Sequence, residues 1–169
     1  MPARRYYIPM HHETDLEWLR AECANAESFE ELAAVAVAEM EKFEDAEIVC
    51  GPLTTGGLGS MEKNMAAFLA VIDMLKKEGR PIYSQGPYEE RIAYLRDRWR
   101  EHHPSRAQLY CTPILEVLYA RIFDAGRIRR AWFIPGWESS LGATWEHDRL
   151  KGAGVEIEYL TPERIQSLL

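Results

Sequence analysis

The sequence lacks the features that mark several large classes of protein. Only three of its 169 residues are cysteine, and Cys23, Cys50 and Cys111 are widely spaced with no CxxC pair. This pattern indicates neither a disulfide framework nor a zinc knuckle, and we interpret the cysteines as structural. The five histidines form no HxH or HExxH pattern. We therefore expect no metal site.

Long apolar runs and an excess of positive charge are also missing. No apolar run approaches the roughly 20 residues that cross a bilayer, and the polar N-terminus is unlike a signal peptide. We therefore expect a cytoplasmic protein with no membrane partner. The formal net charge is −7, which gives no basic field for holding a nucleic-acid polymer. A nucleotide monomer is still compatible with this charge, because a few local donors can hold one phosphate.

What is present is the composition of an ordinary globular protein, since 47% of the residues are apolar and 28% are charged. A chain of 169 residues suits one domain with a core large enough to fold unaided. We expect a single α/β domain over residues 1–169. Residues 1–45 would form an N-terminal strand and helices, and residues 46–160 would form the core.

Short apolar strand patterns alternate with helical periodicity along the chain. Strands are predicted at 5–9, 46–50, 81–84, 130–134 and 155–160. Helices are predicted over about 16–19, 29–43, 61–75, 88–99, 114–123 and 140–151, and after Pro162. The last strand has one polar face and should lie at an edge. This alternation predicts a flavodoxin-like or Rossmann-like three-layer α/β domain with a mainly parallel sheet of about five strands and right-handed crossovers.

Two loops lead from a predicted strand into a helix, at positions suited to a ligand. Residues 51–60 are rich in glycine and threonine, and residues 135–142 are small and polar. In a doubly wound sheet, ligands bind beyond the carboxyl ends of the strands, and helix N-termini favour anions. The first loop has neither the Gly-Lys-Ser/Thr of a Walker loop nor GxGxxG spacing. The sequence of this loop alone is equally compatible with a phosphate-binding loop and with a flexible connector.

Glu146 lies about one turn into the helix that follows the second loop. The positive potential of the helix N-terminus predicts that its side chain is ionised. Such a carboxylate can attack the anomeric carbon of a sugar or stabilise an oxocarbenium ion. Glu138, in the preceding loop, could act as a second acid. A purely structural role for Glu146 at the helix terminus fits the residues equally well.

The residues around these loops resemble the nucleoside 2-deoxyribosyltransferase-like superfamily. The resemblance is carried by Gly51-Pro52-Leu53-Thr54, by Asn64, Phe68 and Leu75, and by Gly136-Trp137-Glu138-x-Ser140-x-Gly142-Ala143-x-x-Glu146. It covers roughly residues 46–160, and the last motif is its most specific part. Many relatives carry an aspartate at the start of the strand before that motif, where this chain has Arg129 and Arg130.

The resemblance implies an enzyme, often oligomeric, that cleaves the N-glycosidic bond of nucleosides or nucleotides. Glu146 matches the glutamate that attacks C1′, leaving a glycosyl-enzyme that another base or water resolves. Ser140 matches a position that helps to bind a 5′-phosphate in the nucleotide hydrolases, and the loop 51–57 matches one near the sugar and base. The substrate-binding residues implied in this way are Gly51, Pro52, Thr54, Thr55, Gly56, Gly136, Trp137, Glu138, Ser140 and Gly142.

We therefore expect hydrolysis or transfer on a small-molecule nucleoside or nucleoside 5′-monophosphate, catalysed by a homo-oligomer (dimer or larger) with no cofactor. The alternative is a nucleotide- or nucleotide-sugar-binding module that uses the same pocket without turnover. A third interpretation, a structural or interaction protein, draws on the five Trp and eight Tyr residues.

The segment 85–127 is longer than the usual connection in this superfamily, so we expect it to reshape the pocket. Its arginines alternate with acidic residues, which favours a solvated helix face over a binding patch. They are Arg91, Arg96, Arg98 and Arg100.

Overall fold

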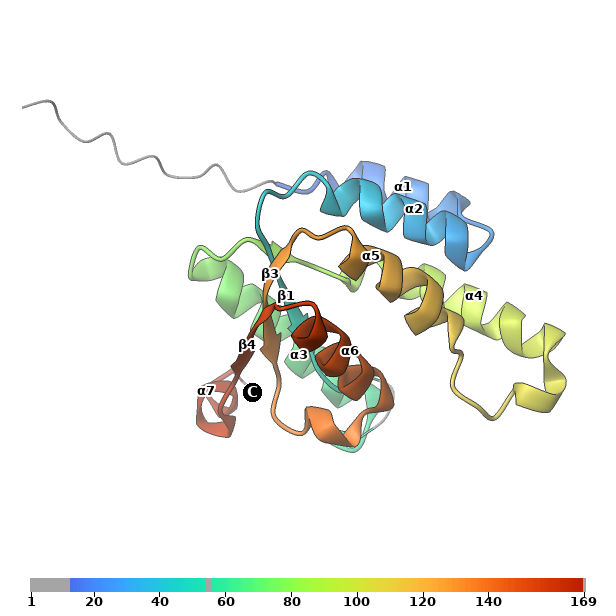
Figure 1. The fold of residues 1–169 in the computed structure, drawn as a ribbon. Helices are drawn as coiled ribbons and strands as arrows, with labels where there is room; N and C mark the ends of the chain where they lie inside the picture. The colour runs from blue at the N-terminus through green and yellow to red at the C-terminus, as the bar shows by residue number, and fades with distance from the viewer. Residues whose placement is uncertain (1–12, 54–55, 169) are drawn as a thin grey trace, which may run out of the picture.

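A four-stranded parallel sheet lies at the centre of the computed structural model, which describes residues 13–53 and 56–168 (Figure 1). The strands are β1 (Ala46–Cys50), β2 (Ile82–Tyr83), β3 (Ile128–Phe133) and β4 (Glu156–Tyr159). Their order is β2-β1-β3-β4, and every pairing is parallel. Four predicted strands are thereby confirmed to within about two residues, and the last one is an edge strand as expected. The predicted strand at 5–9 lies outside the described residues.

Helices cover both faces of the sheet, as the α/β pattern predicted. One face packs against α3 (Met61–Lys77) and α7 (Pro162–Gln166). The opposite face shares a hydrophobic cluster with α1 (Leu16–Asn25), α2 (Phe29–Met40), α4 (Glu89–His102), α5 (Ala120–Asp124) and α6 (Leu141–Gly152). Figure 1 shows α1 and α2 side by side, with α5 next to α2. Within the residues described, no helix is long and apolar enough to cross a membrane.

Shorter helical segments connect these elements. They are the 3-10 turns η1 (Gly86–Tyr88), η2 (Pro104–Arg106) and η4 (Trp137–Ser139), and the π-helix η3 (Ile114–Tyr119) that runs into α5. The sequence predicted one regular helix over 114–123. Instead, the N–H of Ala120 donates to the carbonyl of Leu115, five residues back, which makes the first part wider than an α-helix.

Side-chain caps explain where several helices begin. Ser28 Oγ accepts a hydrogen bond from the Glu31 N–H at the start of α2, as the Ser-x-x-Glu pattern predicted. Of the two serines that could cap α6, Ser140 takes this role and accepts from the Ala143 N–H. The start of α6, and with it the position of Glu146, is therefore fixed by a local hydrogen bond.

Alternation along β1 sends its side chains to opposite faces, and one of them is a fully buried carboxylate, Glu47. It accepts hydrogen bonds from Trp132 Nε1 at 2.7 Å, Arg129 at 3.1 Å and Arg80 at 3.3 Å. Arg130 approaches to 3.7 Å. Burial alone would raise the pKa of Glu47, but the hydrogen bonds from Trp132 and Arg129 and the nearby Arg80 and Arg130 hold that pKa below its ordinary value.

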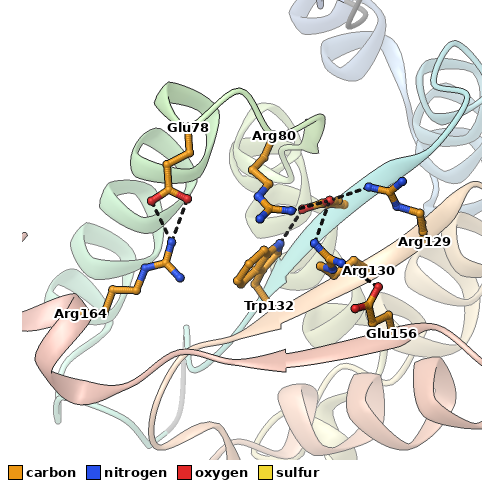
Figure 2. A network of polar contacts seen from close by, with 8 residues as sticks. Glu78, Arg80, Arg129, Arg130, Trp132, Glu156 and Arg164 are labelled. Carbon is orange, nitrogen blue, oxygen red and sulfur yellow. Dashed lines mark hydrogen bonds and ion pairs between the residues drawn. The ribbon is translucent and has the colours of Figure 1, made fainter. Parts of the chain in front are cut away.

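The Glu47 network extends over neighbouring elements (Figure 2). Arg130 also binds Glu156 of β4 at 2.8 Å, and Arg164 of α7 binds both carboxylate oxygens of Glu78 at 2.8 Å. The guanidinium groups of Arg80, Arg130 and Arg164 all lie within 6 Å of the Trp132 ring centroid, at 4.9, 5.6 and 5.5 Å. This cluster joins the strands to α3 and α7 near the amino ends of β1 and β3.

We expect Glu47→Gln to lower the free energy of unfolding at pH 7 by about 2 kcal/mol, because a buried carboxylate that accepts hydrogen bonds from Trp132 and two arginines loses its charge. The stabilisation exists above the unfolded pKa, near the ordinary value of 4.5, and is lost as pH falls through the lowered folded pKa. Urea denaturation should therefore show a smaller difference in unfolding free energy between Glu47→Gln and the wild type at pH 3 than at pH 7.

The matched control for this substitution is Glu156→Gln. Its carboxylate pairs with Arg130, but its side chain is 51% exposed, so the expected cost is at most about 1 kcal/mol. Equal stability of the Glu47→Gln variant and the wild type at pH 7 would contradict the role assigned to Glu47.

Candidate active site

A cavity of about 110 Å³ lies beside the carboxyl end of β1, on the sheet face that carries α6. Four segments form its walls: Gly51 just after β1, the first turns of α6, one side of α4, and the stretch 110–119. The segment 85–127 thus supplies most of the wall of this cavity. Residues of η3 belong to this wall, and π-helical turns are frequent at functional sites.

Glu146 of α6 points into this cavity and is only 8% exposed. Burial raises the pKa of Glu146 to about 8, with a smaller upward effect from Glu89 and a partial offset from the thiol of Cys50. The expectation that the helix N-terminus keeps this carboxyl ionised is therefore wrong. The loss of hydration inside the cavity outweighs the favourable helix dipole, which acts on a side chain already one turn into the helix.

A second carboxyl group, Glu89, lines the same cavity. Glu89 is the first residue of α4, and burial raises its pKa to about 7 although Arg96 acts in the opposite direction. The sequence suggested Glu138 as the second acid, but the Glu138 side chain is exposed and does not line the cavity. The sequence did not single out Glu89, because it lies in a run of charged residues next to Glu90. No sequence pattern indicates which of these two glutamates lines the cavity.

Two arginines of α4, Arg96 and Arg100, also line the cavity. The prediction that all the arginines of this helix form a solvated face is therefore wrong for these two. Arg98 is 41% exposed and binds Glu27 at 2.7 Å, whereas Arg91 is only 15% exposed and binds Glu27 at 2.9 Å. Positions four apart lie on one side of a helix, so Arg96 and Arg100 turn inward together.

The structure brings together some of the predicted site residues and separates others. Gly51, Ser140 and Gly142 line the cavity with Glu146, whereas Pro52 and Gly56 border two other hollows. Thr54 and Thr55 lie outside the described residues. Gly136, Trp137 and Glu138 do not line the cavity.

Trp137 has a different environment from the one its motif suggested. Its ring stacks on His147 of α6 with a centroid distance of 4.2 Å and packs edge-on against Phe133 at 5.2 Å. His147 Nε2 lies 2.7 Å from the Tyr159 hydroxyl on β4. These contacts tie the loop after β3 to α6 and β4, so Trp137 supports the wall that carries Glu146.

The two predicted ligand loops contact each other at the carboxyl ends of β1 and β3. The Gly57 N–H donates to Ser139 Oγ at 3.0 Å, and Ser139 Oγ donates to the Gly136 carbonyl at 2.6 Å. Gly56 and Gly57 both have positive φ, and a Cβ on Gly56 would collide with Ser139. Ser139 therefore joins the two loops, and hollows of about 340 and 360 Å³ border them.

Asn64 of α3 anchors the first loop from the other side. Its Oδ1 accepts from the Leu58 N–H at 2.8 Å, and its Nδ2 donates to the carbonyls of Gly56 at 3.0 Å and Leu53 at 3.3 Å. The described part of this loop is thus a fixed support. The Gly57 N–H, which a phosphate cradle would need, already has a protein acceptor.

Comparisons with protein-family models, with curated proteins and with solved structures find no match to this chain. The resemblance to the deoxyribosyltransferase-like superfamily therefore stays a prediction. Over residues 13–53 and 56–168, no three His, Cys, Asp or Glu side chains are grouped so as to hold a metal ion.

The raised pKa of Glu146 predicts a pH-dependent stability difference. The folded pKa of about 8 exceeds the ordinary value of 4.5, so the folded state binds more protons between these pH values and loses stability as pH rises through them. Gln imitates the neutral acid. Thermal melting should show Glu146→Gln more stable than the wild type at pH 8.5, with little difference at pH 5.

Glu138→Gln is the matched control, because Glu138 is an exposed glutamate in the loop before α6. We expect no pH-dependent difference between this variant and the wild type. Identical melting temperatures of the wild type and Glu146→Gln at pH 8.5 would show that Glu146 is not a buried neutral acid.

Proposed function

We propose that this protein cleaves the N-glycosidic bond of nucleosides or nucleoside 5′-monophosphates, by hydrolysis or transfer, with Glu146 as the nucleophile. The supporting observation is that two carboxyl groups with raised pKa, the buried Glu146 and the half-buried Glu89, share one cavity. Retaining glycosidases work with such a pair, one carboxylate that attacks the sugar and one carboxylic acid that protonates the leaving group. The motif resemblance supports the assignment of attack to Glu146.

In the proposed mechanism the Glu146 carboxylate attacks C1′ while the bond from C1′ to the base nitrogen breaks. The departing base takes a proton from the Glu89 carboxylic acid. The resulting Glu89 carboxylate then removes a proton from water, or from an incoming base, as that molecule displaces Glu146 from C1′. Glu146 is thereby released as a carboxylate and Glu89 as an acid, which restores the starting state.

The proton count of the pair suits this scheme. The pKa of Glu89 is raised to about 7 and that of Glu146 to about 8, so between these pH values the pair holds about one proton. Since the two groups interact, the proton is shared between them and the active form is the one with Glu146 ionised. Hydrogen bonding by a bound substrate can favour that form.

The volume of the cavity limits which part of a substrate can fit inside it. At about 110 Å³ it is smaller than the roughly 300–1,000 Å³ typical of pockets for drug-sized ligands. A compact sugar suits this space, and the base of the substrate would lie towards the mouth.

One observation favours the alternative function, a nucleotide- or nucleotide-sugar-binding module. At pH 7 most Glu146 side chains hold a proton, because burial raises the pKa to about 8. A neutral carboxylic acid donates a hydrogen bond to a ligand but is a poor nucleophile. Ligand binding without base release would select this function.

The direct test incubates the protein with ribo- and deoxyribonucleosides and their 5′-monophosphates, and measures free base by chromatography. We expect base release by the wild type and a loss of at least about 1,000-fold in kcat for Glu146→Gln, because the covalent step is removed. Glu138→Gln should keep full activity. Undiminished turnover by Glu146→Gln would exclude Glu146 as nucleophile, and methanolysis with inversion at C1′ would exclude the covalent intermediate.

The role of Glu89 predicts a bell-shaped pH profile of kcat/KM. Activity should rise near pH 7, as the pair loses its first proton, and fall near pH 8, as it loses the second. Glu89→Gln should slow cleavage about 100-fold or more and remove the alkaline limb. A 7-methylated purine nucleoside, whose base leaves without protonation, should be much less affected by this change.

Glu90→Gln is the control for that experiment, since Glu90 is the exposed neighbour of Glu89. It should leave the rate and the pH profile unchanged. Equal slowing of methylated and unmethylated substrates by Glu89→Gln would contradict a proton-donating role.

A further inference from the structure

Two guanidinium groups line the cavity, and over the described residues their only ion pair is with an exposed carboxylate. The Arg96 side chain is 23% exposed, and its nearest carboxylate, on Asp97, lies 3.5 Å away on a side chain that is 65% exposed. No ion pair in the described part of the chain involves Arg100. By contrast, Arg91 and Arg98 both bind Glu27, at 2.9 and 2.7 Å.

The Nε atom of Arg100 is buried and has no hydrogen-bond partner within the described residues, whereas Arg96 Nε lies 3.5 Å from the exposed Asp97 carboxylate. Buried donors in proteins are nearly always paired, and an unpaired one calls for an explanation. A cationic group that is partly removed from water also loses hydration. A bound anion in the cavity would supply acceptors for both side chains.

The other groups around these arginines do not neutralise them at pH 7. Facing the same space are Glu89, Glu146, Tyr110 and the Cys111 thiol. Burial raises the pKa of each of these groups above its ordinary value, so they are wholly or partly uncharged near neutral pH. Arginine stays charged. The cavity is therefore locally positive in a chain whose net charge is −7.

The start of α6 adds to this positive potential. Ser140, Gly142 and Ala143 line the cavity, and this helix is 12 residues long. Its first N–H groups have no acceptor within the helix, as at any helix N-terminus. The helix terminus and the two guanidinium groups thus surround one small space from different elements.

We propose that Arg96 and Arg100 form a phosphate-binding subsite of the cavity, so that its substrate is a phosphate monoester. The planar guanidinium fork matches the oxygens of a phosphate, and two forks one helical turn apart can hold one such group. The reaction that such a substrate would undergo rests on the proposed function. Binding of the phosphate group by the two arginines does not depend on it. A nucleoside 5′-monophosphate, a pentose phosphate and inorganic phosphate share the chemistry that the subsite recognises.

Isothermal titration calorimetry on the full chain tests this with inorganic phosphate, ribose 5-phosphate and paired sets of nucleosides and their 5′-monophosphates. We expect the monophosphates to bind at least about 10-fold more tightly than the nucleosides, with an affinity that falls as salt increases. Arg96→Gln and Arg100→Gln should each weaken monophosphate binding by about 10- to 100-fold and leave nucleoside binding unchanged. Binding of inorganic phosphate alone, with no preference for any monoester, would overturn the subsite as a substrate determinant.

Controls separate loss of the subsite from loss of the fold. Arg98→Gln removes the same charge from the outer face of α4 and should not change phosphate affinity. Arg96→Lys keeps the charge but not the fork, and should weaken binding less than Arg96→Gln. Melting temperatures of all variants should lie near that of the wild type, and nucleoside binding provides a second check that the cavity is intact.

Failure of this proposal differs from failure of the proposed function. One outcome is that Arg96→Gln loses phosphate-dependent binding while the wild type releases base from no substrate. That result would support the phosphate subsite and exclude the proposed N-glycosidic cleavage. Base release from nucleosides and monophosphates at equal kcat/KM, unchanged in both arginine variants, would overturn the subsite and leave the enzyme standing.

Discussion

The parallel pairing of β1 with β3 determines where Glu47 and Glu146 lie in this protein. At the carboxyl ends Cys50 pairs with Phe133, so the loops that follow leave side by side and meet through Ser139. The first loop leads to α3 on one face, and the second leads to α6 on the other. Because α6 returns over β1, it carries Glu146 to the position beside Cys50. Near the amino ends the same register sets Glu47 beside β3.

Buried carboxyl groups at the two ends of the sheet have opposite electrostatic environments. Although burial opposes ionisation at both, Glu47 receives hydrogen bonds from Trp132 and arginines that hold its pKa low. Glu146 has only a thiol to oppose burial, and its pKa is raised. A group whose hydrogen bonds are already supplied by the protein has a structural role. A group that lacks them can exchange protons with a ligand, which is why perturbed carboxyls cluster at functional sites.

Patterns local in sequence predicted the sheet well, because strand alternation, caps and helix periodicity are local properties. Ser140 and the strand at 46–50 are examples. The ionisation of Glu146 was mispredicted because the walls that exclude water from it come from α4 and η3, distant along the chain. The helical period separates Arg96 and Arg100 from Arg91 and Arg98, but it does not indicate which pair lines the cavity. No pattern in the sequence predicts the π-helical turn of η3.

Part of the motif that carries the resemblance fixes the loops and does not line the cavity. Asn64 anchors the loop after β1, and Ser139, at a variable position of the motif, joins that loop to the one after β3. The cavity that Glu146 lines lies on one face of the sheet, beside α4 and the stretch 110–119. Under the proposed function, the motif therefore positions the nucleophile, while segments outside it supply the proton donor and the positive charge. Substrate choice can then diverge through α4 without disturbing the loops that hold Glu146 in place.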